Sequence, residues 1–198
     1  PEVLSRIKDY PIRVLDVGCG NGALGSSIKK KYPKCNVIGI EFSKNAVINA
    51  ANKLDEVWCL NLNELNPDDI KGEFDLIICA DVIEHLLDPE YCLNVLRSKL
   101  TSNGKMILSI PNLRHWSVLL PLLVNDRFTY TDEGLLDRTH LHLFTFTEIK
   151  LMLSRCKFRV DNTDITMLNQ KPSQIIIDKL LKSITSLGGK EEYAKTTI

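Results

Sequence analysis

The sequence predicts an α/β fold built on a doubly wound, mostly parallel β-sheet, and three observations support this prediction. Strand-like and helix-like segments alternate along the chain, as is typical of sheets covered by helices. The first strand-like segment ends in a run of glycines. The chain has 198 residues and is 44% hydrophobic, which suits one domain with a sizeable buried core. We expect a single domain over residues 1–198, with a sheet of six or seven strands.

The predicted strands are short β-branched and apolar runs bounded by glycine, proline or polar residues. They are expected at residues 12–17, 36–41, 56–60, 73–79, 105–110, 158–165 and 193–198. The run from Glu73 to Cys79 is rich in Leu and Ile, as expected for a strand buried on both faces. Asn103 and Gly104 are expected to turn the chain into the fifth strand, and Pro111 is expected to end it. The last run is short, so the sheet has six strands if that run does not join it.

The predicted helices place apolar residues on one face and begin at side chains suited to capping. Ser43 is the expected N-cap after the second strand, and Asp88, followed by Pro89, is the expected N-cap after the fourth. Thr145 and Glu148 have the spacing of a capping box. The helices are expected to cover residues 2–9, 23–31, 44–54, 89–100, 146–156 and 173–186.

Charge and composition limit the classes of protein to consider. Lys and Arg total 25, as do Asp and Glu, so no net charge draws the chain to nucleic acid or to a membrane. The longest apolar run, 118–124, is interrupted by Pro121 and is too short for a membrane span. The six cysteines form no C-x-x-C pair, which fits a reducing cytoplasm. The chain starts at Pro1 without a leader-like segment, so we expect a cytoplasmic domain excised from a longer protein.

The segment 14–22, with the sequence V-L-D-V-G-C-G-N-G, indicates a nucleotide-binding loop. Gly18, Gly20 and Gly22 allow a tight turn in which bare backbone approaches a ligand. Glu41, at the end of the second predicted strand, is placed to accept hydrogen bonds from the two hydroxyls of a ribose. A cofactor that contains adenosine is therefore expected.

Asp16 distinguishes between two such cofactors. Residues 20–25 also fit G-x-G-x-x-G, the dinucleotide pattern, which leaves a nicotinamide-dependent oxidoreductase as an alternative. A carboxylate two residues before the first glycine repels a pyrophosphate, and it attracts the sulfonium and ammonium of S-adenosylmethionine. The oxidoreductase alternative predicts a small or apolar residue at position 16. The sequence therefore favours S-adenosylmethionine.

Three segments resemble class I S-adenosylmethionine-dependent methyltransferases, which have a Rossmann-like sheet. The segment 14–22 is similar to their first motif, hydrophobic-L-D-x-G-C-G-x-G. The segment 79–86, C-A-D-V-I-E-H-L, resembles methyltransferases related to the ubiquinone-biosynthesis O-methyltransferases, and 109–112 matches their S-x-P-N strand end. The resemblance covers about residues 13–160. It implies transfer of a methyl group by in-line displacement, and an oxygen of a small molecule is the favoured acceptor.

The resemblance also implies which residues bind the cofactor. Asn61 stands where many relatives have an Asp, and its amide oxygen can accept from the adenine amine while Leu62 supplies a backbone N–H and an apolar wall. Backbone carbonyls near Cys79 and Ala80 are expected to receive the ammonium. The full expected cofactor set is Asp16, Gly18, Cys19, Gly20, Gly22, Glu41, Phe42, Asn61, Leu62, Cys79, Ala80 and Asp81.

Glu84, His85 and His140 are the expected catalytic residues. His140 is slightly favoured over His85 as the base that removes the acceptor's proton. Two alternatives stay open. In the first, these side chains order the loop by hydrogen bonds; in the second, Asp81, Glu84 and His85 ligate a divalent metal together with either His140 or His142. The metal alternative resembles a pattern of some ubiquinone-pathway enzymes and of 2′-O-methyltransferases that act on RNA ends, and no metal is assigned.

The segment 111–145 is expected to be a lid-like insertion that binds the acceptor, because so long a connection usually carries function. Its Trp116, Phe128 and Tyr130 either line the acceptor pocket or pack the insertion against the sheet. The expected partner is a small molecule. Nucleic acid is disfavoured by the neutral charge, and a non-catalytic S-adenosylmethionine-binding domain is a further alternative. The sequence predicts no oligomeric state.

Overall fold

The computed structural model describes residues 2–166 and 195–197. The chain divides into two compact units, Pro1–Ser109 and Ile110–Ile198, and each is described by itself. The first unit contains the glycine-rich loop and the predicted cofactor residues. The second contains the segment predicted to be an insertion.

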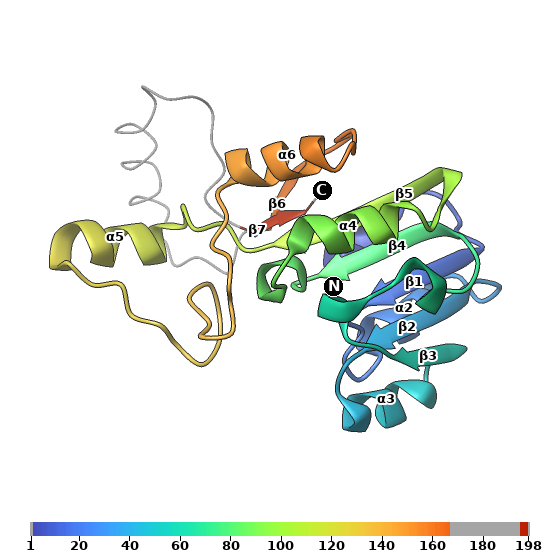
Figure 1. The fold of residues 1–198 in the computed structure, drawn as a ribbon. Coiled ribbons are helices and arrows are strands. Elements are labelled where there is room, and N and C mark those ends of the chain that lie inside the picture. The colour runs from blue at the N-terminus through green and yellow to red at the C-terminus, as the bar shows by residue number, and fades with distance from the viewer. Residues whose placement is uncertain (1, 167–194, 198) are drawn as a thin grey trace. The chain divides into compact units, whose positions relative to one another are not determined.

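The first unit is built on a parallel sheet with strand order β3-β2-β1-β4-β5, shown in Figure 1. The strands are β1 (Arg13–Val17), β2 (Asn36–Glu41), β3 (Glu56–Cys59), β4 (Phe74–Ala80) and β5 (Leu100–Ile110), whose last residue opens the second unit. The chain runs outward from β1 to β3 and then resumes at β4, on the other side of β1. Ligands of such sheets bind beyond the carboxyl ends of the strands, where the order reverses. Here that point lies between β1 and β4.

The helices of the first unit begin where the sequence predicts. They are α1 (Glu2–Arg6), α2 (Ala23–Lys31), α3 (Lys44–Ala51) and α4 (Pro89–Arg97), with short 3₁₀ turns η1 (Leu62–Glu64), η2 (Pro67–Asp69) and η3 (Ile83–His85). The Ser43 side chain accepts from Ala46 N–H at 3.5 Å, and the Asp88 side chain accepts from Tyr91 N–H at 2.9 Å. Both predicted caps are therefore confirmed.

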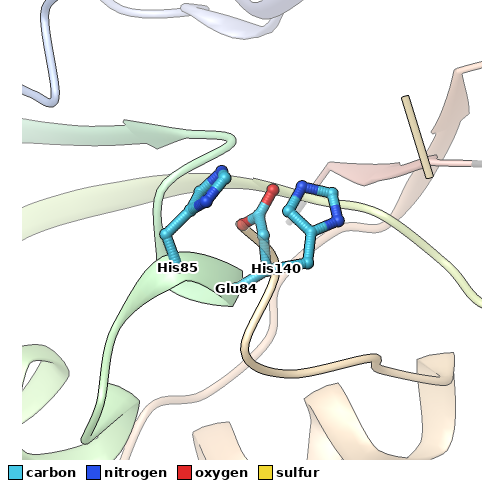
Figure 2. Close-up of side chains that lie close together, drawn as sticks. All are labelled: Glu84, His85 and His140. Carbon is cyan, nitrogen blue, oxygen red and sulfur yellow. The ribbon is translucent and has the colours of Figure 1, made fainter. Parts of the chain in front are cut away.

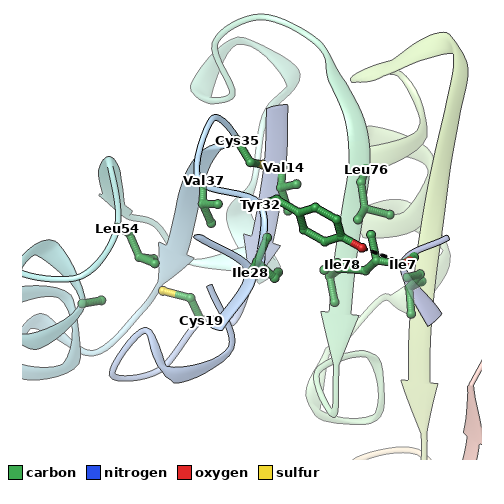
Figure 3. Close-up of a cluster of buried hydrophobic side chains, with 12 residues drawn as sticks. Ile7, Val14, Cys19, Ile28, Tyr32, Cys35, Val37, Leu54, Leu76 and Ile78 are labelled. Atoms are coloured by element: carbon green, nitrogen blue, oxygen red, sulfur yellow. Dashed lines mark hydrogen bonds between the residues drawn. The ribbon is translucent and has the colours of Figure 1, made fainter. Parts of the chain in front are cut away.

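A buried hydrophobic cluster joins α1, α2 and α3 to the sheet, as Figure 3 shows. Val14, Val37 and Ile78 come from β1, β2 and β4, and Ile28 comes from α2. Gly25 lets α2 pack closely against the side chain of Leu54, since a Cβ at position 25 would lie 2.5 Å from Leu54 Cδ2. This close packing fixes α2, and with it the loop that precedes it.

The predicted turn at Asn103 and Gly104 is wrong, because both residues lie within β5. Phe74 pairs with Leu100 and Leu76 with Lys105, so β5 carries extra residues that bulge from the ladder. The sequence signal for a turn reflects this bulge. The strand continues on both sides of it.

The second unit contains α5 (Trp116–Asn125), α6 (Phe146–Arg155) and the antiparallel strands β6 (Asp164–Thr166) and β7 (Lys195–Thr197). Thr145 caps α6 by accepting from Glu148 N–H at 3.3 Å, as predicted. The strand predicted at 158–165 is largely wrong, since only residues 164–166 form one. The helix predicted at 173–186 lies outside the described residues.

The helix α5 was not predicted, because it contains Pro121. A proline in a helix interior removes a hydrogen bond and usually ends the helix. Here Pro121 follows the first turn of α5, and its carbonyl accepts from the backbone N–H groups of Asp126 and Arg127 at the helix end. In the described part of the chain, no helix is both long and apolar enough to cross a membrane.

Candidate functional site

The loop after β1 depends on glycine at three positions. Gly18, Gly20 and Gly22 have φ of +67°, +52° and +73°, in the left-handed region that side chains with a Cβ rarely adopt. A Cβ at Gly18 would lie 2.5 Å from Val82 Cγ2, whereas one at Gly20 would meet no atom of the described residues within 4 Å. The loop is thus crowded at its base and open at Gly20, where a ligand can approach the backbone.

At Asn21 the glycine loop is tied to α3 and to the turn that follows this helix. Asn49 Nδ2 donates to the Asn21 side-chain oxygen at 3.1 Å, and Lys53 Nζ donates to the Asn21 carbonyl at 2.6 Å. Within the loop, Gly22 N–H donates to the Cys19 carbonyl at 2.9 Å. The loop is therefore held in shape without any ligand.

Glu41 ties the same loop to the end of β2. Its Oε2 accepts from Gly20 N–H at 2.9 Å, and its Oε1 accepts from Ser43 N–H at 2.8 Å. Each carboxylate oxygen has a second lone pair, so the fixed carboxylate can still accept from two neighbouring hydroxyls. This geometry suits the ribose contact predicted for Glu41.

Asp16, which the sequence predicts to attract the sulfonium and ammonium of the cofactor, is buried in the structure. It is only 2% exposed, and its Oδ2 accepts from Gly25 N–H in the first turn of α2 at 3.1 Å. Burial raises the pKa of Asp16 to about 7, with the Gly25 hydrogen bond opposing the shift. Its structural role is to anchor the start of α2. The electrostatic argument based on Asp16 is weaker than the sequence suggested.

Two predicted cofactor residues turn their side chains into the protein. Cys19 belongs to the buried cluster of Figure 3, and its Sγ packs where a Cβ on Gly39 would lie, 2.6 Å away. Cys79 is fully buried in β4. Burial raises the pKa of the Cys19 thiol to about 12 and that of Cys79 well above its ordinary value. Both residues can offer only backbone atoms to a ligand.

Asp81, directly after β4, has an unusual backbone conformation. Its φ is +57°, a strained value for a residue with a side chain. Ser109 of β5 holds it there: the Ser109 carbonyl accepts from Asp81 N–H at 2.9 Å, and Ser109 Oγ donates to Asp81 Oδ1 at 3.3 Å. Ser109 is 3% exposed, whereas Asp81 is exposed. The strain therefore presents a carboxylate at the carboxyl end of the sheet.

Glu84 and His85 lie in η3, just beyond Asp81. Glu84 is 1% exposed, and His85 is partly buried. Figure 2 shows their side chains leaving neighbouring positions of this turn. The backbone of η3 is held by His85 N–H to the Val82 carbonyl at 3.1 Å and Leu86 N–H to the Ile83 carbonyl at 3.3 Å.

His140, the third side chain drawn in Figure 2, belongs to the second unit. Its backbone N–H donates to the Asp137 carbonyl at 3.0 Å, and its Nδ1 lies 3.1 Å from the Leu135 carbonyl oxygen. A carbonyl can only accept, so this contact selects the tautomer protonated at Nδ1. Nε2 is then the basic nitrogen. Glu84, His85 and His140 are also of the types that ligate divalent metals, each offering one ligand atom.

The residues predicted to meet adenine lie after β2 and β3. Phe42 is 70% exposed and Leu62 is partly buried. Asn61 Oδ1 accepts from Asn63 N–H at 3.1 Å, so one lone pair of the predicted adenine acceptor is already used. Asn63 Oδ1 in turn accepts from Leu87 N–H at 2.7 Å.

Sequence reasoning missed Val82, Ser109, Asn63 and the pair Asn49 and Lys53. The last two had a signal, since residues four apart lie on one face of the helix predicted at 44–54, although α3 ends at Ala51 and Lys53 follows it. The other three act across long separations along the chain. Their roles follow from the tertiary structure.

Comparison with known proteins identifies related sequences. A protein-family profile described as a methyltransferase domain matches residues 2–163. A ubiquinone biosynthesis O-methyltransferase from Bradyrhizobium diazoefficiens is 30% identical over 111 residues, which are 53% of this chain and 42% of that protein. One from Hydrogenovibrio crunogenus is 27% identical over 119 residues, 58% of this chain and 48% of that protein. The chain thus spans about half the length of the curated relatives it matches.

Solved structures share the fold. The plantazolicin methyltransferase BpumL in complex with SAH aligns with a TM-score of 0.63 at 20% identity, over 99% of this chain and 77% of that one. An SAM-dependent methyltransferase from Archaeoglobus fulgidus aligns with a TM-score of 0.65 at 17% identity, over 99% and 91% of the two chains.

Asp16→Asn should change how stability depends on pH. Because the folded protein raises the Asp16 pKa from 3.8 to about 7, it binds more protons than the unfolded chain between these values. Asp16 therefore lowers the free energy of unfolding as pH rises through this window, by at most about 4 kcal/mol. Urea unfolding from pH 4 to pH 8 should show Asp16→Asn gaining stability relative to wild type as pH rises. A constant difference would contradict the role assigned to Asp16.

The strain at Asp81 predicts an order of stability among its variants. Asp81→Gly should be about 1 kcal/mol more stable than Asp81→Ala, because only glycine adopts this φ without a steric cost. Asp81→Asn should lie between them. Urea unfolding of the three variants at one pH measures the order. If Asp81→Ala equals Asp81→Gly, the backbone at this position is not strained.

Proposed function

Because the chain belongs to the methyltransferase domain family, we propose that it transfers a methyl group from S-adenosylmethionine to an oxygen of a small-molecule acceptor. The observation that carries this proposal is the open backbone at Gly20 beside the fixed carboxylate of Glu41. Two relatives are ubiquinone biosynthesis O-methyltransferases, which supports methyl transfer to an oxygen as the reaction. The fold of its structural neighbours supports the location of the site.

The cofactor is proposed to lie along the carboxyl ends of the first unit's strands. Glu41 accepts from the two ribose hydroxyls while its present bonds hold Gly20 and Ser43. Phe42 and Leu62 offer apolar surface to adenine, and the second lone pair of Asn61 Oδ1 accepts from its amine. The backbone carbonyls near Cys79 and Ala80, at the end of β4, receive the ammonium together with the carboxylate of Asp81. Gly18, Gly20 and Gly22 supply the closely approaching backbone.

The protein's own chemical task is proton removal and alignment. When bound, the cofactor would supply an electrophilic methyl carbon on a sulfonium, with a neutral thioether as the leaving group. His140 Nε2 takes the proton of the acceptor hydroxyl, while the Leu135 carbonyl stabilises the imidazolium through Nδ1–H. Glu84 and His85 orient the acceptor. Holding the reacting atoms in line supplies much of the rate enhancement.

The insertion 111–145 is proposed to bind the acceptor. Its Phe128 and Tyr130 rings pack edge to face with centroids 5.7 Å apart, and both remain partly exposed. The exposed Phe128 and Tyr130 rings would offer apolar surface to a phenolic or other hydroxyl-bearing ring.

A metal-assisted reaction is the second candidate, because Glu84, His85 and His140 are metal-ligand types. Chelation separates the two mechanisms. In the base mechanism, EDTA leaves turnover of a catechol acceptor unchanged. Loss of turnover with EDTA and recovery with Mg²⁺, Mn²⁺ or Zn²⁺ would favour the metal.

Glu41→Ala should weaken binding of S-adenosylhomocysteine at least about 100-fold, since it removes two charge-assisted hydrogen bonds to the ribose. It also releases Gly20 from the end of β2. Isothermal titration calorimetry measures the affinity. Glu56→Ala is the matched control, a carboxylate at the start of the neighbouring β3, and it should bind like wild type. Equal affinities of the two variants would refute the ribose contact.

His140→Ala should lower kcat with a catechol acceptor by about 10²–10⁴-fold, because proton transfer loses its base. Its affinity for S-adenosylhomocysteine should stay near that of wild type. Added imidazole should restore part of the turnover. His142→Ala is the control and should turn over normally. A His140→Ala enzyme with wild-type kcat would remove His140 from the mechanism.

A further inference from the structure

Asn63 joins two parts of the first unit that lie far apart in sequence. Its Oδ1 accepts from Leu87 N–H at 2.7 Å, across 24 residues. Asn63 belongs to η1, after β3, and Leu87 follows η3, after β4. The backbone N–H of Asn63 also donates to Asn61 Oδ1 at 3.1 Å. A continuous hydrogen-bonded path therefore runs from Asn61 through Asn63 to the end of η3.

The turn η3 needs such an anchor. It has three residues and only two backbone hydrogen bonds of its own, at 3.1 Å and 3.3 Å, and 3₁₀ hydrogen bonds have poorer geometry than those of an α-helix. Buried Ile83 and Leu86 fix its inner side. Leu87 is 72% exposed, so apolar burial does not fix the outer end. The bond from Asn63 supplies the restraint there.

We propose that Asn63 is a positioning residue that transmits cofactor binding at Asn61 to the turn carrying Glu84 and His85. This inference rests on the proposed function, in which Asn61 accepts from the adenine amine. Adenine then fixes the segment 61–63, and Asn63 Oδ1 fixes Leu87 N–H at the end of η3. The acceptor-side turn becomes ordered when the cofactor is present.

The hydrogen bond between Leu87 N–H and Asn63 Oδ1 is exposed to solvent, so a ligand can change how often it forms. An exposed hydrogen bond to a neutral amide is individually weak, because water competes for both partners. It opens readily in the free protein and closes when one end is held. Local opening of this kind is measured by amide hydrogen exchange.

NMR measurement of Leu87 amide exchange, with and without saturating S-adenosylhomocysteine, tests the proposal. In wild type the ligand should slow this exchange about tenfold. In Asn63→Ala the ligand should leave it unchanged, while calorimetric affinity falls no more than about threefold. Asn63→Asp keeps a side-chain oxygen at the same place and should restore the slowing. Asn66→Ala removes an asparagine that bonds the Glu64 carbonyl within the same connection, and it should behave like wild type.

The outcomes separate this inference from the proposed function. Ligand-dependent slowing in Asn63→Ala equal to wild type would overturn the role of Asn63 and leave the cofactor assignment intact. The same loss of slowing in Asn66→Ala would also overturn it, because any disturbance of the connection would then suffice. Absence of ligand binding to wild type, seen as unchanged Gly20 and Gly22 amide signals, would overturn both proposals.

Discussion

The hydrogen bond from Gly20 N–H to the Glu41 carboxylate is the constraint on which the site depends. It joins the loop after β1 to the end of β2 and leaves the backbone around Gly20 accessible. A loop of glycines is intrinsically mobile, because glycine has the greatest backbone freedom to lose on folding. Glu41, together with Asn49 of α3 and Lys53 just after this helix, restricts that freedom before a ligand arrives. The site is therefore preorganised at its centre.

The other strand ends of the first unit are coupled to this loop by packing. Val82, directly after Asp81, fills the space that a Cβ on Gly18 would need. Glycine at position 18 is thus required by the approach of the segment after β4, as well as by its own φ. Ser109 stabilises the strained Asp81 from β5. Contacts among β1, β2, β4 and β5 thereby determine where backbone and carboxylates face a ligand.

Much of this arrangement could be predicted from sequence because its signals are local. The bounds of α2 and β2, the caps at Ser43, Asp88 and Thr145, and the need for glycine at 18, 20 and 22 follow from short patterns that the structure confirms. The β5 bulge and the Pro121-containing α5 were misjudged, since tertiary context overrode the local turn and proline signals.

The side chains of Asp16 and Cys19 show what a sequence motif cannot predict, namely which of its residues contact the ligand. Both belong to the motif, yet one anchors α2 and the other packs in the core. A motif identifies residues that a fold requires without separating those that touch the ligand from those that support the loop. Burial makes that distinction, and burial depends on the packing of α2 and α3 against the sheet.

The most direct test is calorimetric titration of the purified domain with S-adenosylhomocysteine and, separately, with NAD⁺ under identical conditions. The account predicts saturable binding of the first with one site per chain and no measurable heat with the second. Binding of NAD⁺ without binding of S-adenosylhomocysteine would contradict it, because the open backbone at Gly20 would then serve a pyrophosphate.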